Sequence, residues 1–136
     1  MLGEREMEVR SKYESPLVLE KIEIVESSFR KKTDSLDSLE LGVQVERNLT
    51  KLDDGLFEVL LETTVSDEEE KVFVNVKGRA VFSTRQENMD ILEKNTIAIM
   101  FPYIRSYISS ITTQPGMSPI VLPAMNIVAM VNDQKK

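Results

Sequence analysis

The sequence has 136 residues, no Cys and no His, a net charge of −6 at pH 7 and a pI near 4.8. The missing residue types exclude disulfides, thiolate chemistry, Ser–His and Cys–His nucleophiles and the usual zinc sites. A carboxylate-only site for magnesium or calcium stays open, with the acidic run 67–70 as its one dense candidate, but this run lacks the spacing and the glycine of a calcium loop. We therefore expect no metal ion and no cofactor. The acidic balance argues against nucleic-acid binding, because such a chain repels phosphate unless it carries a local basic patch.

The N-terminal residues 1–15 are highly charged and contain no apolar stretch. This composition predicts a polar arm and not a signal peptide. Residues 16–136 suit one domain. No stretch is apolar enough to span a bilayer, since Arg105 interrupts the best candidate. We therefore expect a cytoplasmic protein that does not insert into membranes.

Four segments of the first half have the composition or alternation of β-strands. The first runs from Leu17 to about Phe29, and its alternation changes phase after Ile24, which indicates a bulge or an edge strand. The second has the clearest period of two, with Leu39, Leu41, Val43 and Val45 on one side.

The third and fourth strands are expected at 56–65 and 72–82. Leu60 breaks the alternation of the third, and Gly78 indicates a bulge in the fourth. Gly55 after two aspartates predicts a turn with positive φ, and the acidic run 67–70 is interpreted as a solvated turn. Such short connections favour an antiparallel sheet.

A long helix is expected at 96–113, with residues 89–92 as a short helical lead-in. Its apolar stripe is Ile97, Phe101, Ile104, Ile108 and Ile111, with Met100, Tyr103 and Tyr107 to one side. Pro102 allows two solutions: the main helix starts near Phe101, or one helix runs through the proline and kinks.

The helix carries a single charge, at Arg105, so its second side has to be buried as well. It is either the core helix of a monomer or part of a subunit interface, and we favour the interface because the chain is short. The expected interface residues are Met100, Tyr103, Ile104, Tyr107 and Ile108.

The proline- and glycine-containing residues 115–119 end the helix, and residues 120–123 are extended and apolar. Asn126 is a suitable N-cap for a last short helix that carries Ile127 and Met130. Helices that follow strands indicate the α+β class: a four-stranded antiparallel sheet with one long helix and a short C-terminal helix packed on one face.

The C-terminal half resembles SecB, the bacterial protein-export chaperone, and its SecB-like relatives. The resemblance rests on Asn95, on the run Phe-Pro-Tyr-Ile-Arg at 101–105 and on Ile108-Ser109. It continues through Gly116 and Pro119 to Leu122, Asn126, Ile127 and Met130. The order of four strands, long helix, extended crossover and short helix also fits residues 17–134.

The resemblance implies a homotetramer, built as a dimer of dimers with the long helices packed between dimers. It also implies ATP-independent binding of unfolded, export-bound polypeptides in apolar grooves. In typical members these grooves lie between the sheet on one side and the crossover and last helix on the other. The corresponding client-binding positions here are Leu41, Val43, Val45, Ile120, Leu122, Ile127 and Met130.

In this family the solvated sheet face docks the translocase motor SecA through acidic residues. The corresponding positions here fall near Glu26 and Glu69, whereas Arg30 stands at another position that is acidic in typical members. SecB-like relatives also serve toxin–antitoxin pairs, which makes the client an open question.

Three classes of function therefore remain. The leading one is a holdase chaperone, and the second is an oligomeric SecB-like protein dedicated to one partner. The third is an enzyme or a small-ligand protein, such as a hot-dog-type thioesterase. A chaperone should delay the aggregation of several unrelated proteins, whereas a dedicated adaptor should not. The enzyme is disfavoured because hot-dog folds place the long helix before the sheet.

Overall fold

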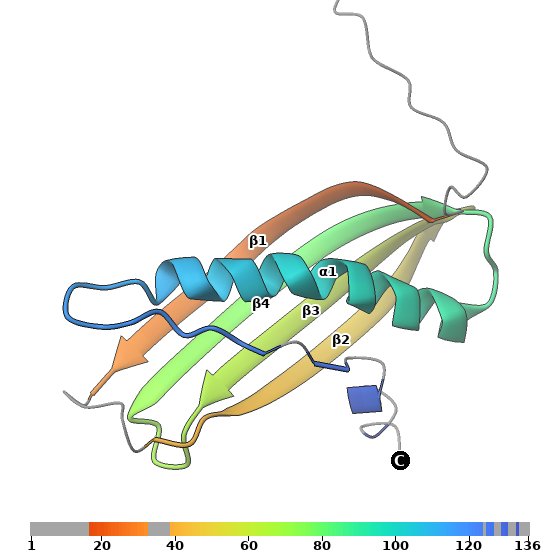
Figure 1. Ribbon diagram of the computed structural model, residues 1–136. Helices are drawn as coiled ribbons and strands as arrows, with labels where there is room; N and C mark the ends of the chain where they lie inside the picture. The colour runs from red at the N-terminus through yellow and green to blue at the C-terminus, as the bar shows by residue number, and fades with distance from the viewer. Residues whose placement is uncertain (1–16, 33–38, 124, 127–128, 131–132, 134–136) are drawn as a thin grey trace, which may run out of the picture.

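The computed structural model describes residues 17–32, 39–123, 125–126, 129–130 and 133 as a curved sheet with a helix across one face (Figure 1). In chain order come β1 (Leu17–Lys31), β2 (Gly42–Asp53), β3 (Leu56–Ser66), β4 (Val72–Thr84) and α1 (Met89–Ile111). This order confirms the predicted α+β class, with a four-stranded antiparallel sheet followed by one long helix.

The strands lie in the order β1-β4-β3-β2, and every neighbouring pair is antiparallel. The hairpin between β2 and β3 turns at Gly55, whose φ is +70° as expected from the sequence. A Cβ at this position would lie 2.9 Å from the carbonyl oxygen of Thr84, so both the conformation and the space require glycine.

Strand β1 is an irregular edge strand, as its change of phase predicted. Its register against β4 shifts between Leu19 and Lys21 and again between Ile24 and Glu26. The second shift makes Val25 an extra residue in β1, the mark of a β-bulge. The predicted bulge at Gly78 is wrong, because β4 pairs regularly with β3 there and the bulge lies opposite, in β1.

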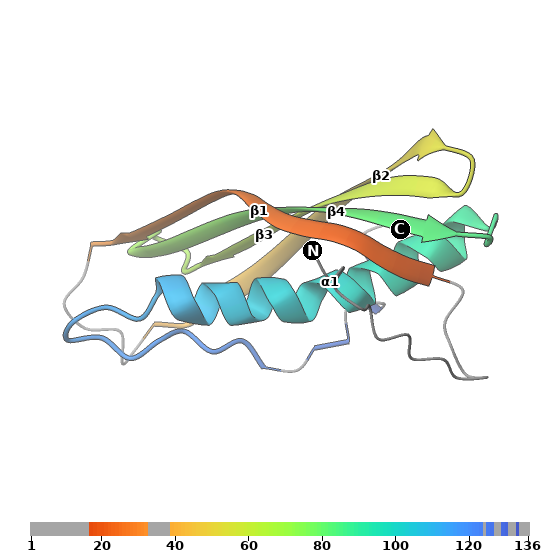
Figure 2. The same ribbon diagram turned by 90° about the horizontal axis from the view of Figure 1, so that it is seen from above.

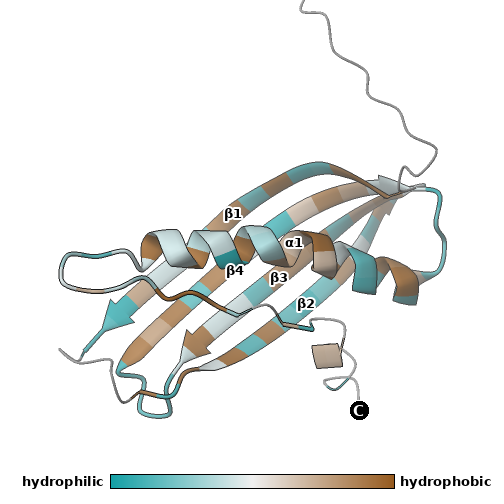
Figure 3. Cartoon of the chain, viewed as in Figure 1, coloured by the Kyte–Doolittle hydropathy of each residue, from teal (hydrophilic) through white to brown (hydrophobic). Residues whose placement is uncertain are grey.

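The two central strands supply most of the core. In β4 every second residue from Val72 to Phe82 is buried, and in β3 the buried set runs from Phe57 to Val65. These side chains face α1, which lies on one side of the sheet only (Figure 2). The strands accordingly alternate between apolar and polar residues (Figure 3).

Helix α1 is one continuous helix that contains Pro102, so the chain runs through the proline as in the second of the two sequence solutions, whose kink stays a prediction. Asn88 caps it: its side-chain oxygen accepts hydrogen bonds from the N–H groups of Asp90 and Ile91. The predicted lead-in at 89–92 is therefore the first turn of the same helix.

The predicted C-terminal helix stays a prediction. The side-chain oxygen of Asn126 accepts a hydrogen bond from Ala129 N–H at 3.0 Å, which is the bond that an N-cap makes. Ile127 lies outside the described residues.

Candidate functional site

The predicted client-binding residues lie in two places. One group lies in β2 and just before it, on the side of the sheet that faces α1 (the inner face), and the other lies in the segment after α1. All of those that the structure describes belong to one hydrophobic cluster or pack against it. Leu41, Val43, Ile120 and Met130 keep part of their surface exposed. Val45 and Leu122 are buried, so they form core and not groove surface, and that part of the prediction has to be corrected.

The segment after α1, residues 113–123, returns along the helix and is here called the crossover (Figure 1). It reverses at 114–117, where Met117 N–H bonds to the Gln114 carbonyl and Gly116 has a φ of +74°. Its apolar stretch from Ile120 to Leu122 appears as a brown run beside the helix (Figure 3).

Two side chains of the last helical turns fix the crossover to α1. The backbone N–H of Ile120 donates to Thr112 Oγ1 at 2.8 Å, and Ser109 Oγ donates to the Ile120 carbonyl at 3.2 Å. Thr112 is fully buried and also donates to the Ile108 carbonyl. Ile120 is therefore held at both backbone groups, while Val121 points outward and is 71% exposed.

A hollow of about 730 Å³ opens where β2 begins. Its lining includes Leu41 and Val43 from the predicted client-binding set and Glu69 from the predicted docking set. The sequence assigned these residues to separate sites, whereas the fold places them around one hollow.

The outer side of α1 is only partly the predicted interface. Met100, Ile104 and Ile108 are fully buried against the sheet of their own chain, so their assignment to an oligomer interface is corrected. Tyr103 is 51% exposed, and Tyr107 is partly buried with its hydroxyl 3.0 Å from Ser27 Oγ on β1. Of the predicted set, only the two tyrosines have surface left for a second copy.

The sheet face away from the helix, here called the open face, carries the predicted docking residue Glu26. Its carboxylate lies 3.6 Å from the ammonium of Lys77. Glu69 lies in the turn between β3 and β4 and pairs with Lys71 at 3.1 Å. Each of these docking candidates thus has a cation of its own chain beside it.

Two arginine side chains make further contacts on the open face. Arg79 donates to Glu58 at 2.6 Å and to Glu23 at 3.2 Å, and these contacts, the Glu58 hydrogen bond first, raise the pKa of Arg79. Arg30 lies 4.5 Å above the ring of Phe73 in a cation–π contact. The residue that departs from the acidic family pattern is therefore stacked on an aromatic ring.

An ion pair between β2 and α1 is a feature that sequence reasoning missed. Arg47 Nε donates to Glu93 Oε1 at 2.8 Å, and the two side chains are only 17% and 19% exposed. Arg47 occupies the inner-face position that follows Val45. The sequence does hold a signal for this ion pair: Arg47 is a charged residue between the apolar residues Val45 and Leu49 on one side of β2.

Among the residues that the structure describes, no group of three or more Asp, Glu, His or Cys side chains could hold a metal ion. No helix of the described part of the chain is both long and apolar enough to cross a membrane.

The family model described as preprotein translocase subunit SecB matches residues 4–136. The chain is 32% identical over 104 residues to the protein-export protein SecB of Methylobacillus flagellatus, covering 71% of this chain and 66% of that protein. It is 34% identical over 107 residues to the protein-export protein SecB of Azoarcus sp. strain BH72, covering 73% and 71%.

A similar fold is found in the SecB-like chaperone Rv1957 of Mycobacterium tuberculosis, solved with a ChAD peptide from the Rv1956 HigA1 antitoxin. The TM-score is 0.64 at 13% identity, over 80% of this chain and 87% of that one. At this identity the likeness concerns the fold alone.

Proposed function

The chain belongs to the SecB family, whose members are chaperones and not enzymes, and from that premise we propose that it is an ATP-independent holdase. It binds unfolded polypeptides, with export-bound preproteins as the expected client class. It acts in the cytoplasm and needs no cofactor.

One observation carries this proposal: apolar side chains from two distant segments stay partly exposed beside a core that is already closed. Leu41 lies just before β2, Val43 lies at its start, and Ile120 belongs to the crossover. Unfolded clients expose apolar side chains, and burying one of these against the protein contributes about 25 cal/mol per Å². The adaptable residue Met125 packs at the same cluster, which suits clients of different shapes.

Two further parts of the proposal concern partners. The chain assembles as a tetramer, a dimer of dimers, with the uncharged outer side of α1 around Tyr103 between dimers. The open face docks SecA through Glu26 and Glu69. The Lys77 and Lys71 ammonium groups beside these carboxylates weaken the attraction for a basic partner.

The proposal is tested by the aggregation of several unrelated, chemically denatured proteins on dilution. The protein should delay aggregation at a near-stoichiometric ratio without ATP. Leu41→Ser and Ile120→Ser should each weaken client binding by about tenfold, because each removes one apolar contact. Leu52→Ser, which changes an exposed residue at the end of β2, is the matched control and should leave binding unchanged.

A dedicated adaptor is the second candidate, favoured by the fold neighbour that was solved with a peptide of one antitoxin. An adaptor would protect a single partner and none of the unrelated clients. Failure of the protein to delay any of these aggregation reactions would contradict the holdase.

A further inference from the structure

The backbone of the crossover's apolar stretch is hydrogen-bonded at one residue. Within the described part of the chain, the backbone groups of residues 118–123 make their hydrogen bonds at Ile120 alone. Pro119 and Pro123 have no N–H to donate. The stretch is not a strand of the sheet, so the backbone position of Ile120 depends on the two α1 side chains that bond to it.

These two side chains, Ser109 and Thr112, lie three residues apart and therefore on the same side of the helix. Ser109 Oγ donates to the Ile120 carbonyl at 3.2 Å, and Thr112 Oγ1 accepts from the Ile120 N–H at 2.8 Å. A residue of a neighbouring antiparallel strand would make the same pair of bonds, one in each direction. The two hydroxyls and the residue that they hold are here called the Ile120 clamp.

Thr112 is itself fixed by the helix. It is fully buried, and its hydroxyl donates to the Ile108 carbonyl at 2.7 Å while it accepts from the crossover. The same carbonyl accepts the backbone N–H of Thr112 at 3.1 Å. The oxygen to which Ile120 bonds is therefore held in place through both the backbone and the side chain of its own residue.

The clamp determines which crossover side chains face the client-binding cluster. Successive side chains of an extended segment point to opposite sides. Ile120 and Leu122 accordingly pack at the cluster, whereas Val121 points outward. Leu122 is buried and Ile120 keeps part of its surface exposed. Fixing the backbone of Ile120 thus fixes the apolar side chain that the crossover offers to a client.

We propose that Thr112 and Ser109 are positioning residues of the client-binding site. They fix Ile120 before a client arrives, so the client does not have to order the crossover, which would lower its affinity. Thr112 is fully buried and acts through Ile120. This inference rests on the proposed holdase function, and it gives a role at the client site to two polar side chains outside the apolar set.

The probe is reduced and carboxymethylated lactalbumin, a chain that stays unfolded, and its affinity for the full protein is measured by fluorescence anisotropy. Thr112→Val keeps the shape of the side chain but removes the hydroxyl, and it should weaken binding about fivefold. Thr112→Ser keeps the hydroxyl and should restore most of the affinity. Ser109→Ala removes the second bond and should weaken binding in the same direction.

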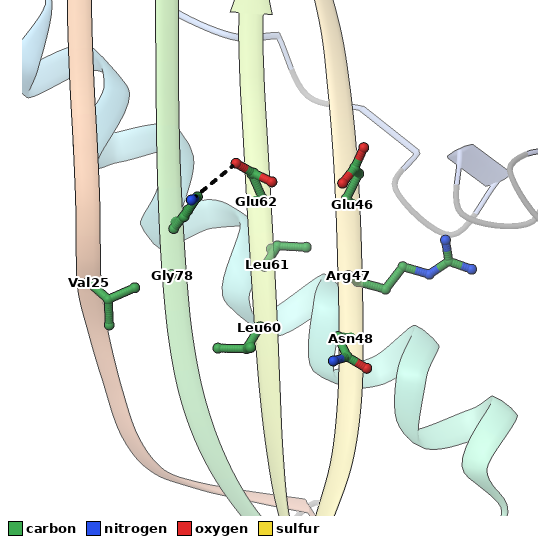
Figure 4. A pocket seen from close by; sticks show the side chains of 9 residues that line it. Val25, Glu46, Arg47, Asn48, Leu60, Leu61, Glu62 and Gly78 are labelled. Carbon is green, nitrogen blue, oxygen red and sulfur yellow. Dashed lines mark ion pairs between the residues drawn. The ribbon is translucent and has the colours of Figure 1, made fainter.

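Thr113→Val is the matched control. Thr113 Oγ1 donates to the Ser109 carbonyl at 2.8 Å in an exposed position and makes no bond to Ile120, so this variant should bind as the unchanged protein does. Leu60→Gln is a second control, because it changes an exposed apolar residue on the side of the sheet away from α1 (Figure 4). It should also leave the affinity unchanged.

Amide hydrogen exchange at Ile120 tests the clamp without a client. Exchange should become faster in Thr112→Val and stay slow in Thr113→Val. Thermal unfolding establishes that the variants fold, and Ser109→Ala carries the test if Thr112→Val does not fold.

Full client affinity of both clamp variants, or an equal loss in Thr113→Val, would overturn the positioning role and leave the holdase standing. An unchanged protein that binds no unfolded lactalbumin would overturn both, so the two failures can be told apart.

Discussion

Position 78 has no side chain because α1 approaches the sheet closely there. A Cβ on Gly78 would lie 2.7 Å from Cδ1 of Ile104, which is fully buried. The sequence indicated that this glycine was special but attributed it to a bulge. A period-two pattern cannot distinguish a glycine that permits a bulge from one that makes room for a helix.

We expect Gly78→Ala to lower the free energy of unfolding by about 1–2 kcal/mol, because the added methyl overpacks the helix–sheet contact. Ile104→Val removes the clashing atom, so the double variant should be more stable than Gly78→Ala alone. Urea unfolding of the two single variants and the double variant measures this coupling. Strictly additive losses would show that the two side chains do not share the space.

Asp67 directly follows β3 and is buried. Its Oδ1 accepts a hydrogen bond from Val72 N–H at 2.8 Å, and this bond is the largest cause that lowers the pKa of Asp67. The folded chain therefore binds this proton less readily than the unfolded chain. The resulting stability is present above the unfolded pKa of about 3.9 and is lost as the pH falls through the folded pKa.

Asp67→Asn keeps an acceptor oxygen but removes the charge. Its free energy of unfolding should fall below that of the unchanged protein at neutral pH, and the difference should shrink in strong acid. Urea unfolding at neutral pH and near pH 3, below the unfolded pKa, measures both differences. A difference that stays constant with pH would contradict the role of the carboxylate.

At the scale of elements, Pro102 is tolerated inside α1 because of where it lies. Proline leaves the carbonyl four residues earlier, that of Ala98, without its helical partner. Both residues are exposed, so water can satisfy that carbonyl. The sequence identified the apolar stripe correctly but assigned Met100, Ile104 and Ile108 to an interface, since periodicity reveals the apolar side of a helix and not which structure covers it.

The Arg47–Glu93 pair joins α1 to the edge strand β2. Arg47→Met should lower the free energy of unfolding by about 1–3 kcal/mol, because Glu93 then loses its 2.8 Å partner in a largely buried position. The double variant with Glu93→Met should recover most of the loss, since apolar residues can replace such a pair.

Lys51→Met is the matched control for that comparison. It removes the exposed pair between Lys51 of the same strand and Asp54 of the following turn, which should contribute little to stability. Urea unfolding compares all four proteins. A double variant as unstable as the sum of its two single variants would show that the pair is not coupled.

At the scale of the whole molecule, the proposed tetramer can be tested at Tyr103. In the single chain this side chain is half exposed, so Tyr103→Asp should leave the fold intact. If α1 packs between dimers, the introduced carboxylate is buried there without a partner and should reduce assembly. Sedimentation should give a tetramer for the unchanged protein and a smaller species for the variant.

Leu52→Asp, on β2, is the control and should sediment as the unchanged protein does. A 15.5 kDa species alone for the unchanged chain at micromolar concentration would contradict the tetramer.

The order of the elements could be predicted because each strand and the helix carry their own period, and the connections between strands are short. The exposure of individual groove residues could not. Val45 and Leu122 lie far apart in the chain, but both are buried members of one hydrophobic cluster, which the pattern of a single strand cannot reveal. The exposure of Val25 was hidden for a related reason, since a change of phase indicates a bulge without saying which way its side chain points.

The crossover has a further consequence for how the protein behaves at high concentration. Pro119 and Pro123 stand two residues before and two residues after the exposed Val121. Proline offers no backbone N–H, so a neighbouring molecule cannot form a β-ladder across either end of this apolar stretch. The exposed segment is therefore too short to serve as an effective template for fibre growth.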